Sequence, residues 1–157
     1  MMTLPQTHEA FAFYPTQPEL EDWIASIWQL ADTTPMEVEI LPDPGWRNNF
    51  GTLHMAFNRL VRFSPQGMRP FYGVWQPVVT GPCPLAVHLP GYGAELSVHP
   101  DTAAQGFNVL QLSPMGYWTP DGYDESLRKN GHFPVLPDTI ETRAQGGYRH
   151  WLLCCVL

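Results

Sequence analysis

The segment 84–112 constrains the fold of this chain more strongly than any other stretch. It contains two short apolar runs, at 85–89 and 107–112, with a Gly-Tyr-Gly loop at 91–93 and a helix-compatible stretch at 98–105 between them. Apolar runs of this length, bounded by proline and glycine, are typical of strands that are buried on both faces. The length of the connection predicts that the two strands run parallel, as a βαβ unit within a sheet.

An amphipathic helix is predicted near the N-terminus, and together with an arm formed by residues 1–15 it makes up the segment 1–35. Thr16 and Glu19 form a capping box in front of it. The apolar residues that follow recur at helical spacing: Leu20, Trp23, Ile24, Ile27, Trp28 and Ala31. This spacing predicts one apolar face over 16–31, with both tryptophans anchored in the core.

Alternating polar and apolar residues predict an antiparallel β-meander within 36–80. Its strands are expected at 36–41, 53–63 and 71–79. Residues 113–145, which follow the βαβ unit, are interrupted by prolines and are expected to form a long irregular loop. Residues 146–157 are expected to begin a helix whose apolar face carries Tyr148, Trp151, Leu152 and Cys155.

The length and composition indicate one domain and exclude several classes of partner. A chain of 157 residues is the size of a single domain with its own core. A net charge of −7 argues against a nucleic-acid partner, because no basic patch could neutralise the phosphates. There is no run of about 18 apolar residues and no secretory signal, so we expect no membrane partner and a cytoplasmic location.

No metal and no cofactor are expected from the cysteines, histidines and glycines. Cys83, Cys154 and Cys155 include no C-x-x-C pair, and the adjacent two are best explained as small buried residues. The histidines lack a metal-binding spacing, and His88 is expected to be a hydrogen-bonded core residue. The Gly-x-Gly at 91–93 lacks the third glycine of a dinucleotide-binding loop.

The order of these elements resembles the first half of an α/β-hydrolase, and most of all the branch of acetyl xylan esterases, cephalosporin deacetylases and dienelactone hydrolases. In that branch the third strand ends in a His-Gly-Tyr or His-Gly-Gly loop, where this chain has Pro90-Gly91-Tyr92-Gly93. The segment 146–152 is similar to the helix that precedes the nucleophile strand. The resemblance implies that 1–157 forms one incomplete, three-layer α/β-hydrolase domain, in which a β-meander leads into the βαβ unit.

The resemblance also implies a role for the glycine loop. In this fold a backbone N–H after the third strand stabilises the negative oxygen of the tetrahedral intermediate. Tyr92 N–H is the candidate oxyanion-hole donor, while Gly91 and Gly93 let the backbone turn sharply. Tyr117 and Trp118 are candidates for a pocket wall. The alternative is that the two glycines only make a strand-to-helix turn.

No catalytic residue is expected within the chain. The nucleophile of this fold lies in a Gly-x-Ser-x-Gly elbow, and no serine of the sequence lies in that motif. The acid and the histidine follow the serine in chain order. The chain is therefore expected to be the N-terminal part of a carboxylic ester hydrolase that is inactive alone, and whether it is an enzyme stays open. A small ester would bind only if the missing half were supplied.

Two further expectations concern partners. A parallel sheet cut after its fourth strand has an open edge, which predicts pairing with a second chain or self-association. The competing hypothesis is a non-catalytic module that binds carbohydrate or protein through the aromatic loop with Tyr117, Trp118 and Tyr123. These aromatic residues could instead simply cover the sheet.

Overall fold

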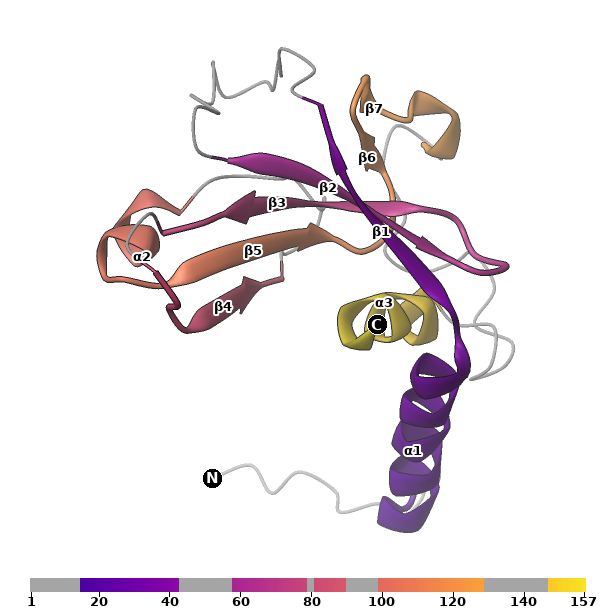
Figure 1. Ribbon diagram of the computed structural model, residues 1–157. Helices are drawn as coiled ribbons and strands as arrows, with labels where there is room; N and C mark the ends of the chain where they lie inside the picture. Colours follow the sequence, from indigo (N-terminus) through magenta and orange to yellow (C-terminus); the bar gives the residue numbers. More distant parts are fainter. Residues whose placement is uncertain (1–14, 43–57, 79–80, 90–98, 129–146) are drawn as a thin grey trace, which may run out of the picture.

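Five strands form one mixed sheet, with helix α3 on one face and a short β-hairpin on the other (Figure 1). The computed structural model describes residues 15–42, 58–78, 81–89, 99–128 and 147–157. In chain order the elements are α1 (Gln17–Thr33), β1 (Met36–Leu41), β2 (Arg59–Pro65), β3 (Phe71–Gln76), β4 (Leu85–His88), α2 (Pro100–Ala104), β5 (Asn108–Ser113), β6 (Trp118–Thr119), β7 (Gly122–Tyr123), a 3₁₀ turn (Glu125–Leu127) and α3 (Gly147–Val156). The fold is mixed α/β, as the sequence predicts.

Helix α1 begins at the predicted capping box. The Glu19 carboxylate accepts hydrogen bonds from the backbone N–H and the hydroxyl of Thr16, both at 2.8 Å. At the other end, Thr34 N–H donates to Ala31 O at 3.2 Å, and Thr34 itself has extended backbone. No helix within the described ranges is long and apolar enough to cross a membrane.

The apolar face of α1 is more exposed than predicted. Ile27 is 3% exposed, whereas Trp28 is 52% exposed, so the prediction that both tryptophans anchor the core is wrong for Trp28. The reason is that α1 packs against α3 and not against the sheet (Figure 1). One neighbouring helix covers only a narrow strip of a helix surface. Leu20 and Ile24 lie outside that strip and are 43% and 42% exposed.

The strands lie in the order β1-β2-β3-β5-β4. The first three form the predicted antiparallel meander. Strand β5 pairs antiparallel with β3 and parallel with β4, so the predicted parallel βαβ unit is confirmed. Strand β2 begins at Arg59, so Asn58 of the strand predicted at 53–63 is not part of it, and residues 53–57 lie outside the described ranges.

Strand β4 is an edge strand, and the prediction that it is buried on both faces is wrong. Leu85 is 53% exposed and Val87 is 50% exposed, and His88, predicted to lie in the core, is exposed as well. The crossover places β5 between β3 and β4. Strand β5 is therefore covered by a neighbouring strand on each side, whereas β4 lies at the edge. Within the described part of the chain, β4 pairs only with β5.

Each face of the sheet carries its own apolar core. Beneath α3, Phe71 and Leu112 pack against Cys154. On the opposite face, Leu60 and Val74 pack against Trp118 of the hairpin. Because side chains alternate along a strand, neighbouring residues of β3 contribute to opposite layers.

The C-terminal helix is present as predicted, but it turns a different face to the sheet. Leu153 and Cys154 are buried, at 4% and 1% exposure, whereas Trp151, Leu152 and Cys155 of the predicted face are only half-buried. The helix spans ten residues, and in this sequence two neighbouring faces of the helix are apolar. Helical spacing alone therefore does not select the buried face.

The predicted irregular loop at 113–145 contains regular structure in its described part. Strands β6 and β7 form a small antiparallel hairpin that covers the sheet. Gly116 enables the turn into it: its φ is +64°, and a Cβ there would lie 2.6 Å from Pro70 O. The ring of Trp118 then lies edge-on to Tyr72, with 6.3 Å between ring centroids.

Candidate functional site

Three polar side chains are buried on the sheet face that the hairpin covers. Gln76 at the end of β3 is 6% exposed, and Gln111 and Ser113 in β5 are 1% and 0% exposed. Burial of polar groups is unfavourable unless they form hydrogen bonds. Such a cluster therefore marks either a structural network or a functional site.

His99 connects the two glutamines. Its backbone N–H donates to Gln76 Oε1 at 2.7 Å, and its ring Nε2 lies 3.1 Å from Gln111 Oε1. Because an amide oxygen can only accept, this contact requires a proton on Nε2 of the imidazole. His99 stands at the N-cap of α2, so the contact fixes the start of that helix over β5.

His88, at the end of β4, lies against His99. The two ring centroids are 4.1 Å apart and the ring planes are inclined by 45°. Partial desolvation lowers the pKa of His88, and the neighbouring His99 lowers it further. Both effects disfavour the charged imidazolium, so the neutral form of the His88 ring is favoured at pH 7. A neutral, exposed imidazole can accept a proton or a hydrogen bond.

This cluster has the composition of a polar site but not of a metal centre. Among the described residues, no three histidine, cysteine or acidic side chains lie close enough together to hold a metal ion. Two imidazoles alone are fewer than the three or four protein ligands of a zinc site.

The predicted oxyanion loop lies between His88 and His99 in the chain. Gly91, Tyr92 and Gly93 lie outside the described residues, so their roles stay predictions. His88 is the last residue of β4, and the segment leading to the loop therefore begins at the carboxyl end of a parallel strand. In open α/β sheets this is the end at which ligands bind.

Tyr117 and Trp118 lie in the interior. Tyr117 is 5% exposed and packs with Met115 and Leu127, while Trp118 is 3% exposed and packs on Leu60 and Val74. The contacts of Trp118 are those of a residue that covers the sheet, whereas Tyr117 packs within the segment that carries the hairpin. A role of either residue in a pocket wall stays a prediction. A ring this deeply buried has no free face on which a sugar could stack.

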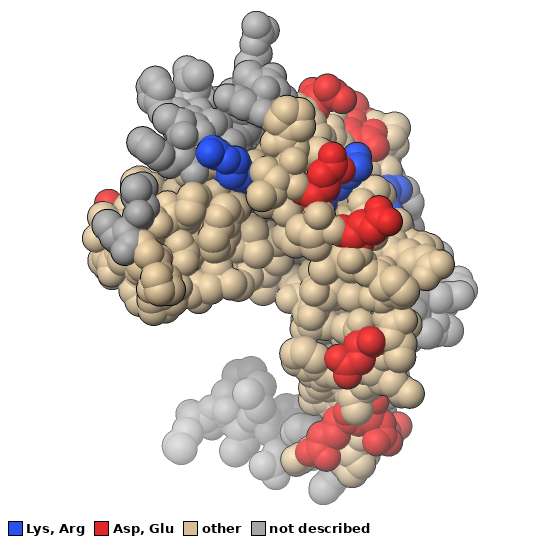
Figure 2. Space-filling view, in the orientation of Figure 1, with Lys and Arg blue, Asp and Glu red and all other residues tan. Residues whose placement is uncertain are grey.

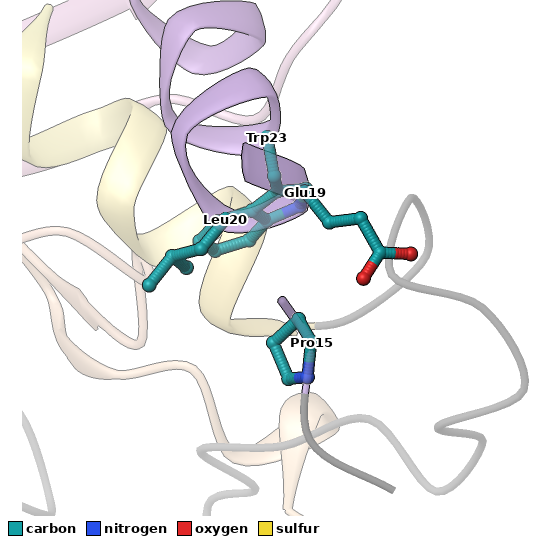
Figure 3. A pocket seen from close by; sticks show the side chains of 4 residues that line it. All are labelled: Pro15, Glu19, Leu20 and Trp23. Atoms are coloured by element: carbon teal, nitrogen blue, oxygen red, sulfur yellow. The ribbon is translucent and has the colours of Figure 1, made fainter. Parts of the chain in front are cut away.

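An apolar pocket lies on α1, away from the polar cluster. Pro15, Leu20 and Trp23 line it, and Figure 3 shows the Glu19 side chain at its rim, with the carboxylate directed away from Leu20. The indole Nε1 of Trp23 is buried without a hydrogen-bond partner in the described structure. The Glu19 carboxylate accepts hydrogen bonds from Thr16, and the other lining side chains are apolar, so the pocket could hold an apolar group.

The thiols of α3 are not reactive groups. Burial raises the pKa of Cys154 to about 12 and that of Cys155 to about 11, and the thiolate is the reactive form. His150 lies one turn before Cys154, with 3.6 Å between Nε2 and Sγ. Burial lowers the pKa of His150, and the charge of Arg69 lowers it further. This pair therefore packs as a neutral contact, in line with the prediction that these cysteines are small core residues.

Charged side chains are few on the face shown in Figure 2. Acidic groups gather along α1 and around β1, while the surface around β4 is almost free of charge (Figure 2). Arg62 and Glu39 form an ion pair across β1 and β2.

Sequence reasoning missed the contacts among His88, His99 and Gln111. The available signal was Gln111 itself, a polar residue inside the apolar run 107–112.

Comparison with known proteins gives no match: no family model, no curated protein and no solved structure is significantly similar to this chain.

Proposed function

We propose that this chain is the N-terminal part of an α/β-hydrolase-type carboxylic ester hydrolase, of the acetyl esterase or deacetylase kind. It supplies the oxyanion loop, and the nucleophile, acid and histidine come from elsewhere. The observation that carries the proposal is the succession β2-β3-β5-β4, in which β3 is antiparallel to both neighbours and β4 is parallel to β5.

The strand order supports the proposal because the first four strands of an α/β-hydrolase sheet are arranged in the same way. Its first two strands are antiparallel, and its fourth strand lies between the second and the third. Strand β4 then corresponds to the third strand, whose following loop contributes an oxyanion N–H in that fold. Here that loop is the one with Tyr92.

The serines support a missing nucleophile. Ser113 is the last residue of β5 and is 0% exposed in the described structure, so no substrate could reach it. Ser26 lies on α1, Ser64 within β2, and Ser126 in the 3₁₀ turn. None of these is on the strand-to-helix elbow that exposes the nucleophile in this fold. Ser97 lies outside the described residues, and its neighbours in the sequence do not form Gly-x-Ser-x-Gly.

The loop would contribute through the transition state. Its N–H would point at the oxygen that becomes negative as the ester carbonyl is attacked. Removing one such donor typically lowers kcat about 10²–10³-fold. A single residue of this chain would thus be required by a reaction whose nucleophile lies outside it.

The test begins with the coding sequence downstream of Leu157, which is expected to encode Gly-x-Ser-x-Gly. The extended protein should hydrolyse 4-nitrophenyl acetate, while the 157-residue chain should not. In the extended protein, Tyr92→Pro removes the N–H and should lower kcat about 10²–10³-fold. Tyr92→Phe keeps the N–H and serves as the matched control.

Two outcomes would overturn the proposal. One is a downstream sequence without the serine elbow. The other is ester hydrolysis by the 157-residue chain that disappears in Ser113→Ala, since this would mean that the nucleophile is already present.

A further inference from the structure

The two edges of the sheet differ in how they are protected. Edge strand β1 carries Glu37 and Glu39, and charges of this kind prevent edge-to-edge pairing. Edge strand β4 has no charged residue, and its Leu85 and Val87 are 53% and 50% exposed. An uncharged, apolar edge strand with unpaired backbone groups is a template for another strand.

The hydrogen bonding of β4 shows which backbone groups are directed outward. Asn108 N–H donates to Pro84 O at 2.8 Å, so Pro84 faces β5. Backbone groups alternate in direction along a strand of a parallel ladder. The N–H and C=O groups of Leu85 and Val87 therefore point away from β5, toward the open edge.

We propose that the 157-residue chain forms a two-fold symmetric dimer in which β4 pairs antiparallel with β4 of a second copy. The two-fold axis passes beside Val87, so that Val87 lies opposite Val87 of the second copy and Leu85 lies opposite its Leu89. The two five-stranded sheets then join into one continuous sheet. This inference rests on the β4 edge and does not require the proposed function.

This register satisfies both the backbone and the side chains. Val87 has its backbone groups directed outward, and a symmetric pair of such residues exchanges two hydrogen bonds. Residues directly opposite each other in an antiparallel pair lie on the same face, so Leu85, Val87 and Leu89 of both copies form one apolar stripe. A pairing shifted by one residue would oppose side chains from different faces.

Charge favours a second copy as the occupant and limits the assembly to two. The segment 84–89 contains no acidic or basic side chain other than His88, so two copies do not repel each other there. The register places His88 opposite Ala86 of the second copy and not opposite the second His88. After pairing, the outer edges of the joined sheet, among the strands that the structure describes, are the two β1 strands with their glutamates. A closed two-fold contact does not propagate into a fibre.

The test measures the mass of the purified chain by light scattering over a wide concentration series. The expected species is a dimer of the 17.8-kDa chain. Val87→Lys places two cations opposite each other and should raise the dimer Kd by about tenfold or more. Val38→Lys is the matched control, because Val38 is a comparably exposed valine, at 58%, on the other edge strand.

A cross-linking variant keeps the proposal testable if Val87→Lys does not fold. With Cys83 and Cys155 changed to serine, Val87→Cys should form an intermolecular disulfide on mild oxidation. Opposite residues in a hydrogen-bonded antiparallel pair have Cα atoms about 5.5 Å apart, within disulfide range. Val38→Cys in the same background should not cross-link.

Three results would overturn the proposal. They are a wild-type chain that is monomeric at all concentrations, a dimer that Val38→Lys weakens and Val87→Lys does not, and cross-linking that is more efficient in the Val38→Cys variant than in Val87→Cys. A dimer with the expected behaviour leaves the esterase proposal undecided, and the absence of esterase activity leaves the dimer unaffected. The two proposals therefore fail separately.

Discussion

His99 and Gln111 join helix α2 to strand β5 through a contact of 3.1 Å between the imidazole Nε2 and the amide Oε1. Gln111 is 1% exposed, so its amide depends on protein partners and not on bulk water. The contact also positions His99 against His88, at the end of the edge strand. The polar cluster therefore connects the crossover helix, the central strand and the edge strand.

Replacing Gln111 by leucine tests the energetic role of this contact. Gln111→Leu keeps the volume but leaves the Nε2 proton of His99 without its acceptor, which should cost about 1–3 kcal/mol of unfolding free energy. Urea denaturation followed by tryptophan fluorescence measures the loss. Gln66→Leu is the control, because Gln66 is exposed in the turn between β2 and β3 and should change stability little. Equal effects of the two substitutions would contradict a structural role for Gln111.

Local sequence patterns predicted the type of each helix or strand better than they predicted which of its residues are buried. Thr16 and Glu19 form the predicted capping box because every group involved lies within one helical turn. The same holds for the alternation that predicted β1, since period two depends only on the strand itself. The type of these elements could thus be predicted from residues that are close together in the sequence.

Burial depends on partners that the local pattern does not contain. The run at 85–89 has the composition of a central strand, yet the sheet order places β4 at an edge and β5 inside. Trp28 is exposed for a related reason, because α1 packs on a helix and not on the sheet. The contact between His99 and Gln111 requires both the crossover and the strand register, so no spacing along the chain could have predicted it.

Substitution of Trp118 tests whether this side chain covers the sheet or binds a ligand. Trp118→Ala removes a side chain that is 3% exposed and packs on Leu60 and Val74, so it should destabilise the protein by about 3–5 kcal/mol. Thermal unfolding followed by circular dichroism measures this effect. Soluble oligosaccharides should leave the tryptophan fluorescence of the wild-type chain unchanged. A saturable fluorescence change that Trp118→Phe abolishes, in a folded protein, would favour the binding module instead.

The three cysteines should differ in their rates of alkylation. Cys83 is partly exposed in the segment before β4, while burial raises the pKa of Cys154 to about 12 and that of Cys155 to about 11. Iodoacetamide at about pH 8 should therefore modify Cys83 first and Cys154 last, because only the thiolate reacts. Peptide mass spectrometry over a time course assigns the order. In denaturant all three should react at similar rates, and rapid native labelling of Cys154 would be inconsistent with the packing of α3 on Phe71 and Leu112.

The imidazole of His150 should make the protein less stable in mild acid. Burial and the charge of Arg69 lower its pKa in the folded state below the ordinary histidine value of about 6.5. Above that value both the folded and the unfolded states are neutral at this position, and stability does not depend on pH through His150. As the pH falls below about 6.5 the unfolded chain takes up the proton first, so the unfolding free energy decreases until the folded pKa is passed.

The pKa of His88 is also lowered, so His88 likewise makes the protein less stable in mild acid. His88 is therefore replaced by glutamine in the reference protein. In that background, His150→Gln should reduce the difference in unfolding free energy between about pH 7.5 and about pH 5.5, measured by urea titration at both values. If the difference is unchanged in His150→Gln, the acid sensitivity arises from other groups and His150 is not held neutral by its site beneath the sheet.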